Sequence, residues 1–309
     1  MSDHSTVEVP AEYSGIRADR VLALLSGLSR ATVRQLIEDG SVTCREIPIA
    51  RSQKLVAGDV IVYPTPEPPE ALGPEILDFD VVFESPEAIV VDKPAGLVVH
   101  PGAGHGTGTL ANGLVDRYPE LLEMGEEHRW GLVHRLDRDT SGLLLVARNP
   151  QVLQFLQTEL KARRIGRTYV TLVDGHLDAA TGTIDAPIGR DPGRPTRMAV
   201  VRDGRPARTH YRRLAQWAGC TLVEVSLETG RTHQIRVHMA SVGNGVIGDS
   251  TYGKRVVGDA DPGRVWLHAR RLQFPLPGGD DQLVESEIST DLAASLDSLG
   301  EPVSGAVDL

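Results

Sequence analysis

The sequence predicts an α+β protein in which a small α/β unit precedes a larger body built on a mixed, mainly antiparallel sheet. Three observations lead to this fold class. Short β-branched runs separated by Gly and Pro dominate the chain from residue 81 onward. Only two amphipathic helical patterns interrupt these runs, which favours an antiparallel arrangement. A proline-rich stretch separates this region from an earlier unit, and 309 residues exceed the usual size of one compact domain.

The first unit is assigned to residues 14–63 and is predicted to contain two helices followed by short strands. One helix is expected from Ala18. A second is expected to begin at Ser29, whose hydroxyl suits an N-cap, and to stop at Gly40, which tolerates the left-handed conformation. The apolar stripe of the second helix consists of Val33, Leu36 and Ile37. The residues before this unit are expected to be mobile.

A linker and a larger body follow the first unit. Residues 64–80, which include PTPEPPEALGP, are too rich in proline to continue a helix or strand and are predicted to form a semi-rigid linker. The body is assigned to residues 81–275. Helices are expected to open at Asn149-Pro150 and near Thr232. Strands are expected at the runs 88–91, 97–99, 143–146, 168–173, 210–214 and 222–226.

Charge is distributed unevenly along the chain. The formal net charge is −10, but residues 272–309 carry eight acids and no Lys or Arg, so the preceding residues carry only −2. Residues 276–309 are therefore assigned to an acidic C-terminal tail. Between residues 189 and 213, by contrast, eight arginines face two aspartates. Such a patch suits phosphate groups, although on composition alone a solvated arginine-rich surface explains it equally well.

Cysteine usage and hydropathy narrow the class of protein. Cys44 and Cys220 stand apart, with no CxxC pair and no histidine at metal-binding spacing, so neither a disulfide framework nor structural zinc is expected. No apolar run reaches the roughly eighteen residues that span a bilayer, and MSDHSTVEVP lacks the features of a signal peptide. We therefore expect a cytoplasmic protein without a membrane partner.

The segment GLVHRLDRDTSGLLLVAR, from Gly131 to Arg148, carries the strongest chemical signal in the chain. Two apolar, strand-like runs flank a tight polar turn, which places Asp137 and Asp139 on a strand-to-strand loop. Loops held by rigid strands commonly display reactive groups. The alternative is an Asx-type turn in which both carboxylates only bind backbone amides, and for an arbitrary loop aspartate that alternative is the more common outcome.

Three motifs in this order resemble the RluA/RluD family of pseudouridine synthases: DKPAGLVVHPG, HRLDRDTSG and GRTHQIRVHM. The resemblance extends from about Val81 through Gly253. The unit from Ser14 to Tyr63 also resembles the alpha-L RNA-binding motif that often precedes such enzymes. The resemblance implies a pseudouridine synthase fold and an enzyme that isomerises uridine in structured RNA.

The resemblance also implies roles for four residues. Asp137, the aspartate of HRLD, is the expected catalytic carboxylate, either as a nucleophile at the anomeric carbon or as a base that leads to a glycal; the sequence leaves both open. Arg236 is expected to pair with this carboxylate and keep it ionised. Tyr169 is expected to pack against the target base. Arg135 is expected to fill the gap left by the everted nucleotide, which offsets part of the cost of base flipping.

Arg17, Arg30 and Arg34 match the positions of the alpha-L motif that contact RNA phosphates. The chain departs from the family pattern in three places. GNGVIGD stands where relatives tend to have a His-Pro pair, Arg167 replaces a common lysine, and Cys44 with Arg45 replaces the usual Val-Asn-Gly turn. The last departure leaves the manner in which the first unit binds RNA open.

No metal or cofactor is expected. His134, His233 and His238 lie in different motifs, and no carboxylate or cysteine completes a zinc-binding spacing around them. The reaction that the resemblance implies also conserves redox state and composition.

The expected partner is large-subunit ribosomal RNA, and the protein is expected to be a monomer. Enzymes acting on transfer RNA share the same motifs. A non-catalytic RNA-binding assembly factor is a second alternative, which the presence of Asp137, Tyr169 and Arg236 together disfavours. A glycosidase or nucleosidase for small molecules is a third, which the basic segments disfavour.

Overall fold

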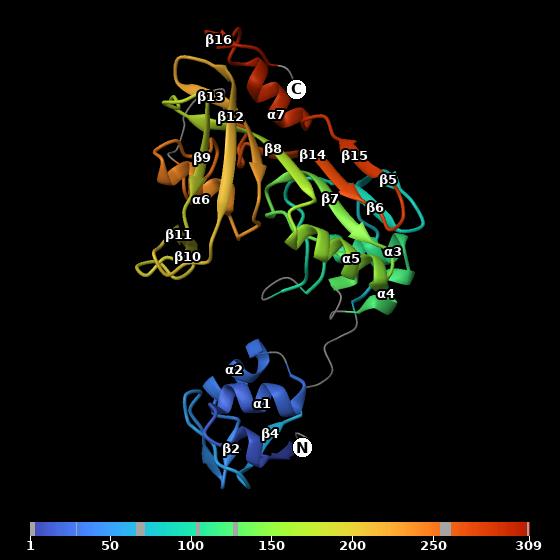
Figure 1. Cartoon of the computed structure of the whole chain (residues 1–309), viewed down its shortest axis with the longest axis vertical. Coiled ribbons are helices and arrows are strands. Elements are labelled where there is room, and N and C mark those ends of the chain that lie inside the picture. The colour runs from blue at the N-terminus through green and yellow to red at the C-terminus, as the bar shows by residue number, and fades with distance from the viewer. Residues whose placement is uncertain are drawn as a thin grey trace. The chain divides into compact units, whose positions relative to one another are not determined.

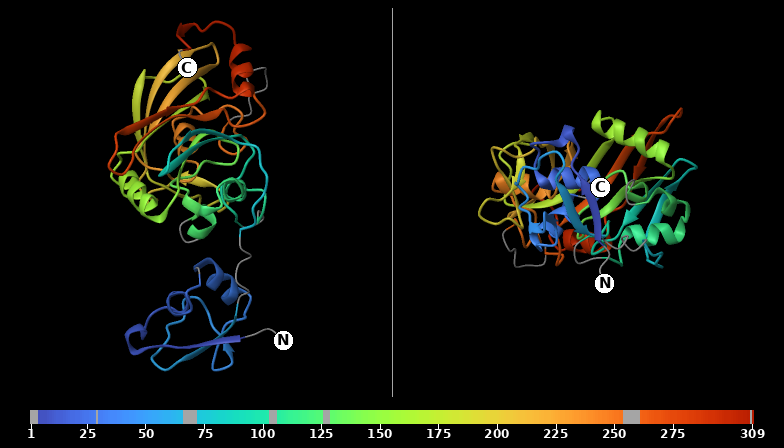
Figure 2. Two further views of the ribbon diagram at one scale, coloured as in Figure 1. Left: turned by 90° about the vertical axis from the view of Figure 1, so that its right-hand side faces the viewer. Right: turned by 90° about the horizontal axis from the view of Figure 1, so that it is seen from below.

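The computed structural model describes residues 4–28, 30–65, 72–102, 106–125, 129–253, 261–307 and 309, with only the backbone of Arg30 and Ala31 described. The chain forms two compact units, Met1–Ala71 and Leu72–Leu309. Their helices and strands can be followed in Figure 1 and, from two further sides, in Figure 2. None of the helices in the described ranges combines the length and hydropathy that crossing a bilayer requires.

The first unit packs two helices against a small antiparallel sheet. The strand order is β1 (His4–Glu8), β4 (Val60–Pro64), β2 (Thr43–Cys44) and β3 (Ile47–Pro48). The helices are the short 3-10 helix η1 (Ala11–Tyr13), α1 (Ala18–Ser26) and α2 (Arg30–Glu38). Fully buried apolar side chains from both helices and the sheet form its core, among them Val21, Leu22, Val33, Leu55 and Ile61.

The boundary expected at Ser14 is wrong, because the chain before it is part of the first unit. β1 pairs with β4 over five residues, and Val9 is 1 % exposed. The alternating pattern of β1 buries only one face partially, which explains why periodicity alone did not identify this strand. Gly40 adopts the expected left-handed conformation just after α2, with φ of 71°. The predicted N-cap Ser29 lies outside the described residues.

The second unit is built on a large sheet, which confirms the expected α+β class with mainly antiparallel pairing. The strand order is β16-β12-β13-β8-β14-β7-β6-β5, with β15 beside β14 and β9 beside β12. Only β7 and β14 pair in parallel among the described strands of this sheet. The strands are β5 (Asp80–Glu84), β6 (Ala88–Lys93), β7 (Ser141–Ala147), β8 (Gly166–Asp174), β9 (Thr181–Asp185), β12 (Arg208–Gln216), β13 (Cys220–Leu227), β14 (Leu267–Pro275), β15 (Asp281–Glu285) and β16 (Ser304–Gly305).

β7 forms the centre of this core. All seven of its residues are buried, and the run Leu143–Val146 is at most 1 % exposed. Each such side chain contributes roughly 1.5–3 kcal/mol through the area that it removes from water. Gly142 lies where β7 meets β14, with φ of 107°, and a Cβ there would stand 2.3 Å from the Ala269 carbonyl oxygen. Glycine is therefore required at this position for the two backbones to approach each other.

Helices cover the sheet, and a small hairpin extends from it. α5 (Pro150–Lys161) packs on β7 and β14, and Asn149 caps it by accepting a hydrogen bond from the Val152 amide, as the sequence predicted. α6 (Gln234–Ser241) begins two residues after Thr232 and contacts β12 and β11. The remaining elements are α3 (Leu110–Arg117), α4 (Glu120–Met124), η2 (Arg129–Gly131), α7 (Thr290–Asp297), and the hairpin of β10 (Ile188–Arg190) and β11 (Met198–Val200).

Two further expectations are wrong at the start of the second unit. Residues 97–99 do not form a strand; Val98 makes only an isolated bridge, to Thr109. The Lys93 ammonium binds the carbonyl oxygens of Pro94 and Leu97 and folds this segment into a turn. The linker is also shorter than 64–80, because Leu72 and Phe79 are buried in the core of the second unit.

Residues 276–309 are not merely an acidic tail. β15 pairs with β14, β16 pairs with β12, and α7 buries Leu292 and Leu296 in the core. Two of the acids are neutralised locally, since Asp291 pairs with Arg264 and Glu285 with Arg271. Composition indicated the charge of this segment, but the two leucines one helical turn apart decide its place in the fold.

Candidate active site

A cavity of about 500 Å³ opens over the centre of the large sheet. Its wall comes from the loop before β7, the end of α5, the start of β8, the segment between β13 and α6, and Leu267 of β14. The structure brings Asp137, Tyr169, Arg236 and Arg135 together in this wall, although they are far apart in the sequence. Seven Lys or Arg side chains line the cavity against two acids, Asp137 and Glu228, so its field favours an anionic ligand.

The loop that carries Asp137 is fixed at both ends. Val133 donates its amide hydrogen bond to the Leu145 carbonyl of β7, and the Thr140 amide donates to the Asp137 carbonyl in a tight turn. The Asp137 side chain is 20 % exposed, which leaves it accessible from the cavity. A loop supported in this way holds a reactive group with little loss of conformational entropy on binding.

Lys93 supports this loop from beneath. Its side chain is fully buried, and its Nζ donates to the carbonyl oxygens of Pro94, Leu97 and Arg138 at 2.7–3.0 Å. Burial lowers the pKa of Lys93 to about 7. The Gly96 amide donates to the same Arg138 carbonyl. The buried Lys93 amine thus joins the DKPAG and HRLDRD segments, because it donates to main-chain carbonyl oxygens of both.

Arg236 lies between two carboxylates. Its Nη1 donates to Asp137 Oδ2 at 3.1 Å, while Nε and Nη2 donate to the two oxygens of Asp249 at 2.7 and 2.8 Å. Burial lowers the pKa of Arg236, but its bonds to Asp249 and the charges of both aspartates outweigh burial and raise it. For Asp249, burial raises the pKa of the carboxyl group, but the hydrogen bonds and charge of Arg236 outweigh burial, so the pKa of Asp249 is lowered. Asp249 therefore orients the guanidinium so that one edge faces Asp137.

An aromatic and an imidazole complete the surroundings of this pair. The Tyr252 ring lies 5.1 Å from the Arg236 guanidinium carbon, and its hydroxyl forms a 2.7 Å hydrogen bond with His233 Nδ1. His233 Nε2 lies 3.9 Å from Asp137 Oδ1. Burial lowers the pKa of His233, so the ring is neutral near pH 7 and this approach is not an ion pair.

Tyr169 and Arg135 occupy different parts of the wall. Tyr169 lies on β8, is 5 % exposed, and its pKa is raised by burial. Arg135 is exposed and lies two residues before Asp137 on the same loop. The cavity wall thus contains a buried ring on β8 and an exposed cation two residues from the carboxylate.

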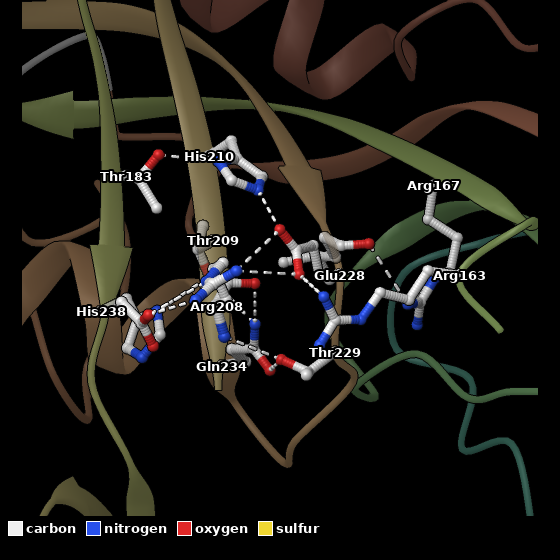
Figure 3. A network of polar contacts seen from close by, with 12 residues as sticks. Arg163, Arg167, Thr183, Arg208, Thr209, His210, Glu228, Thr229, Gln234 and His238 are labelled. Atoms are coloured by element: carbon white, nitrogen blue, oxygen red, sulfur yellow. Dashed lines mark hydrogen bonds and ion pairs between the residues drawn. The ribbon is translucent and has the colours of Figure 1, made fainter. Parts of the chain in front are cut away.

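The segment after β13 is held by polar contacts that Figure 3 shows. Glu228 accepts from Arg163, Arg208 and His210, and Gln234 at the start of α6 bonds Thr229, the Arg231 amide and the Arg208 carbonyl. This network fixes the beginning of α6, from which Arg236 projects. Among the described residues, no group of three or more His, Cys, Asp or Glu side chains is placed to hold a metal.

In the first unit, two of the three arginines expected to contact RNA have carboxylate partners. Arg17 binds Asp19 and Arg34 binds Glu38, and their side chains are 55 % and 60 % exposed. Such exposed pairs are weak and can exchange for phosphate contacts. The side chain of Arg30 lies outside the described part of the chain.

Sequence reasoning missed the residues that support the site, above all Asp249, Lys93 and Tyr252. Lys93 stands inside the quoted DKPAG motif and was open to recognition. Asp249 ends GNGVIGD, a segment noted only for its departure from the family pattern, and nothing in its spacing indicated a bond to Arg236. Contacts between distant segments of this kind require the fold.

Comparison with known proteins identifies the family. The family model for RNA pseudouridylate synthase matches residues 87–241. An uncharacterised RNA pseudouridine synthase of Chloroflexus aurantiacus is 46 % identical over 89 % of this chain and 87 % of that protein. The ribosomal large subunit pseudouridine synthase D of Nitrosomonas europaea is 41 % identical over 96 % of this chain and 89 % of that protein.

A solved structure agrees with these sequence matches. Human RNA Pseudouridylate Synthase Domain Containing 1 superposes with a TM-score of 0.58 at 28 % identity, covering 79 % of this chain and 94 % of that one. The motifs, the fold and the relatives all point to one enzyme class. The chain belongs to the RNA pseudouridylate synthase family, in its RluA/RluD branch, and is an isomerase that acts on RNA.

Proposed function

We propose that this enzyme converts specific uridines of large-subunit ribosomal RNA to pseudouridine, with Asp137 as the catalytic carboxylate. The observation that carries the proposal is the arrangement of Asp137, Arg236 and Asp249 at the cavity. Arg236 uses two nitrogens to bind Asp249 and offers one to Asp137 Oδ2. Asp137 Oδ1 accepts no hydrogen bond from any residue in the described ranges. One carboxylate oxygen is thus held and the other is available to substrate.

The chemistry follows from this geometry. The N-glycosidic bond of uridine breaks, and its electron pair leaves with the base. Asp137 either forms a bond to the anomeric carbon or removes a proton from the neighbouring sugar carbon, and both routes need an ionised oxygen. The base then turns over and bonds the anomeric carbon through C5. This breaks the ester bond to Asp137 in the first route, and in the second route the proton that Asp137 removed returns to the neighbouring sugar carbon. The C5 proton passes to solvent, and N1 gains a proton. The positive charge of Arg236 lies beside Asp137, with its Nη1 3.1 Å from Oδ2, and attracts the negative charge of the carboxylate.

Access to the sugar requires an everted nucleotide. Tyr169 supplies a buried ring against which the flipped base packs, a contact worth roughly 1–3 kcal/mol in nucleic-acid complexes. Arg135, exposed on the Asp137 loop, occupies the space that the base leaves in the RNA and offsets part of the unstacking cost.

The basic surfaces support a structured RNA as substrate. Besides the cavity wall, the segment around the β10–β11 hairpin carries Arg194, Arg197, Arg202 and Arg205, none of which pairs with a carboxylate in the described ranges. We further propose that the first unit binds RNA through Arg17, Arg30 and Arg34, and that the protein acts as a monomer in the cytoplasm without a cofactor. Large-subunit RNA is favoured because relatives that match 96 % and 92 % of this chain are named for it.

The Asp137→Asn variant tests the catalytic proposal. RNA labelled with tritium at C5 of uridine releases the label only when C5 bonds the sugar. We expect release with the natural enzyme and none with the variant, while RNA binding and the unfolding temperature stay unchanged. Retained turnover would refute the role of Asp137. Pseudouridine mapping across total RNA from cells with and without the protein identifies the target, and sites found only in transfer RNA would refute the ribosomal assignment.

A further inference from the structure

Arg167 differs from the other arginines around the cavity because it is buried without a counter-ion. It is 7 % exposed, and its one hydrogen bond to a described residue is from Nη2 to the Leu227 carbonyl, at 3.3 Å. Its Nε is buried with no acceptor. Figure 3 shows the contrast: Arg163 and Arg208 converge on Glu228, whereas Arg167 beside them reaches only the backbone.

The position of Arg167 directs its charge at the reaction centre. Arg167 and Tyr169 are two residues apart on β8, so their side chains lie on the same face of the sheet, and both line the cavity. Burial raises the pKa of the Tyr169 phenol, while the charge of Arg167 lowers it and that of Asp137 raises it, so the ring lies within the field of both groups. A Cβ at Gly230 would stand 2.9 Å from Arg167 Nη1, so the guanidinium lies directly against this loop residue.

A second unsatisfied donor lies in the same wall. His134 Nε2 accepts a hydrogen bond from the Leu145 amide, which leaves the ring proton on Nδ1, and Nδ1 is buried without an acceptor. Burial and the charge of Arg167 lower the pKa of His134 to about 3, so the ring is neutral. An isolated buried cation beside an unused N–H is unfavourable in the free protein. Such an arrangement is stabilised when a ligand brings an anion or carbonyl oxygens.

We propose that Arg167 is a catalytic residue that stabilises the departing base. This inference rests on the proposed function. When the bond between N1 and the anomeric carbon breaks, the electron pair leaves with N1 and the free base is a uracil anion whose charge spreads over N1 and its two carbonyl oxygens. A fixed cation in a site shielded from water lowers the energy of this anion, and it needs no reorganisation during the reaction. His134 Nδ1 adds a neutral donor for one carbonyl oxygen.

Measuring the reaction rate and the RNA affinity of Arg167 variants separates leaving-group stabilisation from phosphate binding. Arg167→Met removes the charge and keeps much of the volume. We expect the single-turnover rate constant for uridine RNA to fall about 100- to 1,000-fold, the cost of losing one preorganised donor at a developing anion. The dissociation constant for RNA should change less than about twofold. Arg167→Lys should recover most of the rate. Arg271→Met, which removes an exposed arginine on β14 paired with Glu285, is the matched control and should leave both quantities unchanged.

The decisive measurement varies the leaving group. Fluorine at C5 makes the base a more stable anion, so RNA with 5-fluorouridine at the modified position depends less on Arg167. Because fluorine does not leave as the proton does, the reaction is followed as loss of N-linked 5-fluorouridine in one turnover. We expect the deficit of Arg167→Met to shrink at least about tenfold on this substrate. The variant should also unfold at no lower temperature than the natural protein, since it loses an unpaired buried charge.

Four results would overturn the inference. They are an unchanged rate in Arg167→Met, an equal deficit on uridine and 5-fluorouridine, a misfolded Arg167→Met protein, and a loss confined to RNA affinity with a flatter salt dependence. The last result would assign Arg167 to a phosphate instead. Tritium release by the natural enzyme tests the proposed function separately, so a failure of the inference and a failure of the function are distinguishable.

Discussion

The bond between Arg236 and Asp249 gives the sharpest test of how the site is built. Asp249 accepts four hydrogen bonds, from Arg236 Nε and Nη2 and from the amides of Thr251 and Tyr252. Its side chain is 0 % exposed and that of Arg236 is 9 % exposed. Asp249→Asn keeps the shape and one acceptor oxygen but turns an N–H toward Arg236 Nε. The buried guanidinium then keeps only Asp137 as a charged partner.

The expected cost follows from these contacts. Losing one charge-assisted bond and leaving a partly uncompensated buried cation lowers the free energy of unfolding by roughly 3 kcal/mol. For a unit of this size that corresponds to a fall in the unfolding temperature of about 6–12 °C. Arg236 would also turn from its fixed orientation, so we expect tritium release to slow by about 100-fold. Calorimetry measures the first effect, and the control is Asp139→Asn, which changes a partly exposed aspartate whose side chain pairs with exposed Arg138.

The pKa shift of Asp249 also predicts how the stability difference between the natural protein and Asp249→Asn changes with pH. The pKa of Asp249 in the folded protein lies below its ordinary value of 3.8, so ionised Asp249 stabilises the fold above that pH, and its contribution is lost as the pH falls through the folded-state pKa. The stability difference between the natural protein and Asp249→Asn should therefore be full at pH 7 and shrink below about pH 4. An Asp249→Asn protein as stable and active as the natural one at pH 7 would refute this account of Arg236.

Two further predictions concern the supports of the site and the first unit. Lys93→Met leaves the carbonyl oxygens of Pro94 and Leu97 without the Lys93 donor, and the Arg138 carbonyl keeps only the Gly96 amide. The free energy of unfolding should therefore fall by about 3 kcal/mol, and tritium release should fall with it. Exposed Lys161→Met should not destabilise the fold, and equal unfolding temperatures of the two variants would contradict this role of Lys93. Changing Arg30 and Arg34 together to Ala should weaken RNA binding and reduce the slope of log affinity against log salt by roughly 0.7–0.9 for each lost phosphate contact. Arg45→Ala is the control. An unchanged slope would show that these arginines of the first unit do not contact phosphates.

The sequence by itself determined the family, the fold class and the candidate carboxylate. These properties are encoded locally, because the motif around Asp137 is contiguous and the β-branched runs mark strands such as β7 without knowledge of their neighbours. The start of α5 was also predictable from the sequence, since Asn149 and Pro150 are adjacent in the chain and form the cap by themselves.

The tertiary structure alone decided what surrounds the carboxylate. Arg236 and Asp137 are separated by 99 residues, Lys93 and Arg138 by 45, and Asp249 reaches Arg236 only because the segment after α6 turns back toward it. The place of α7 and the unpaired state of Arg167 depend in the same way on which strands become neighbours. Burial and hydrogen-bond partners are properties of packed surfaces, and packing joins residues whose separation along the chain carries no periodic signal.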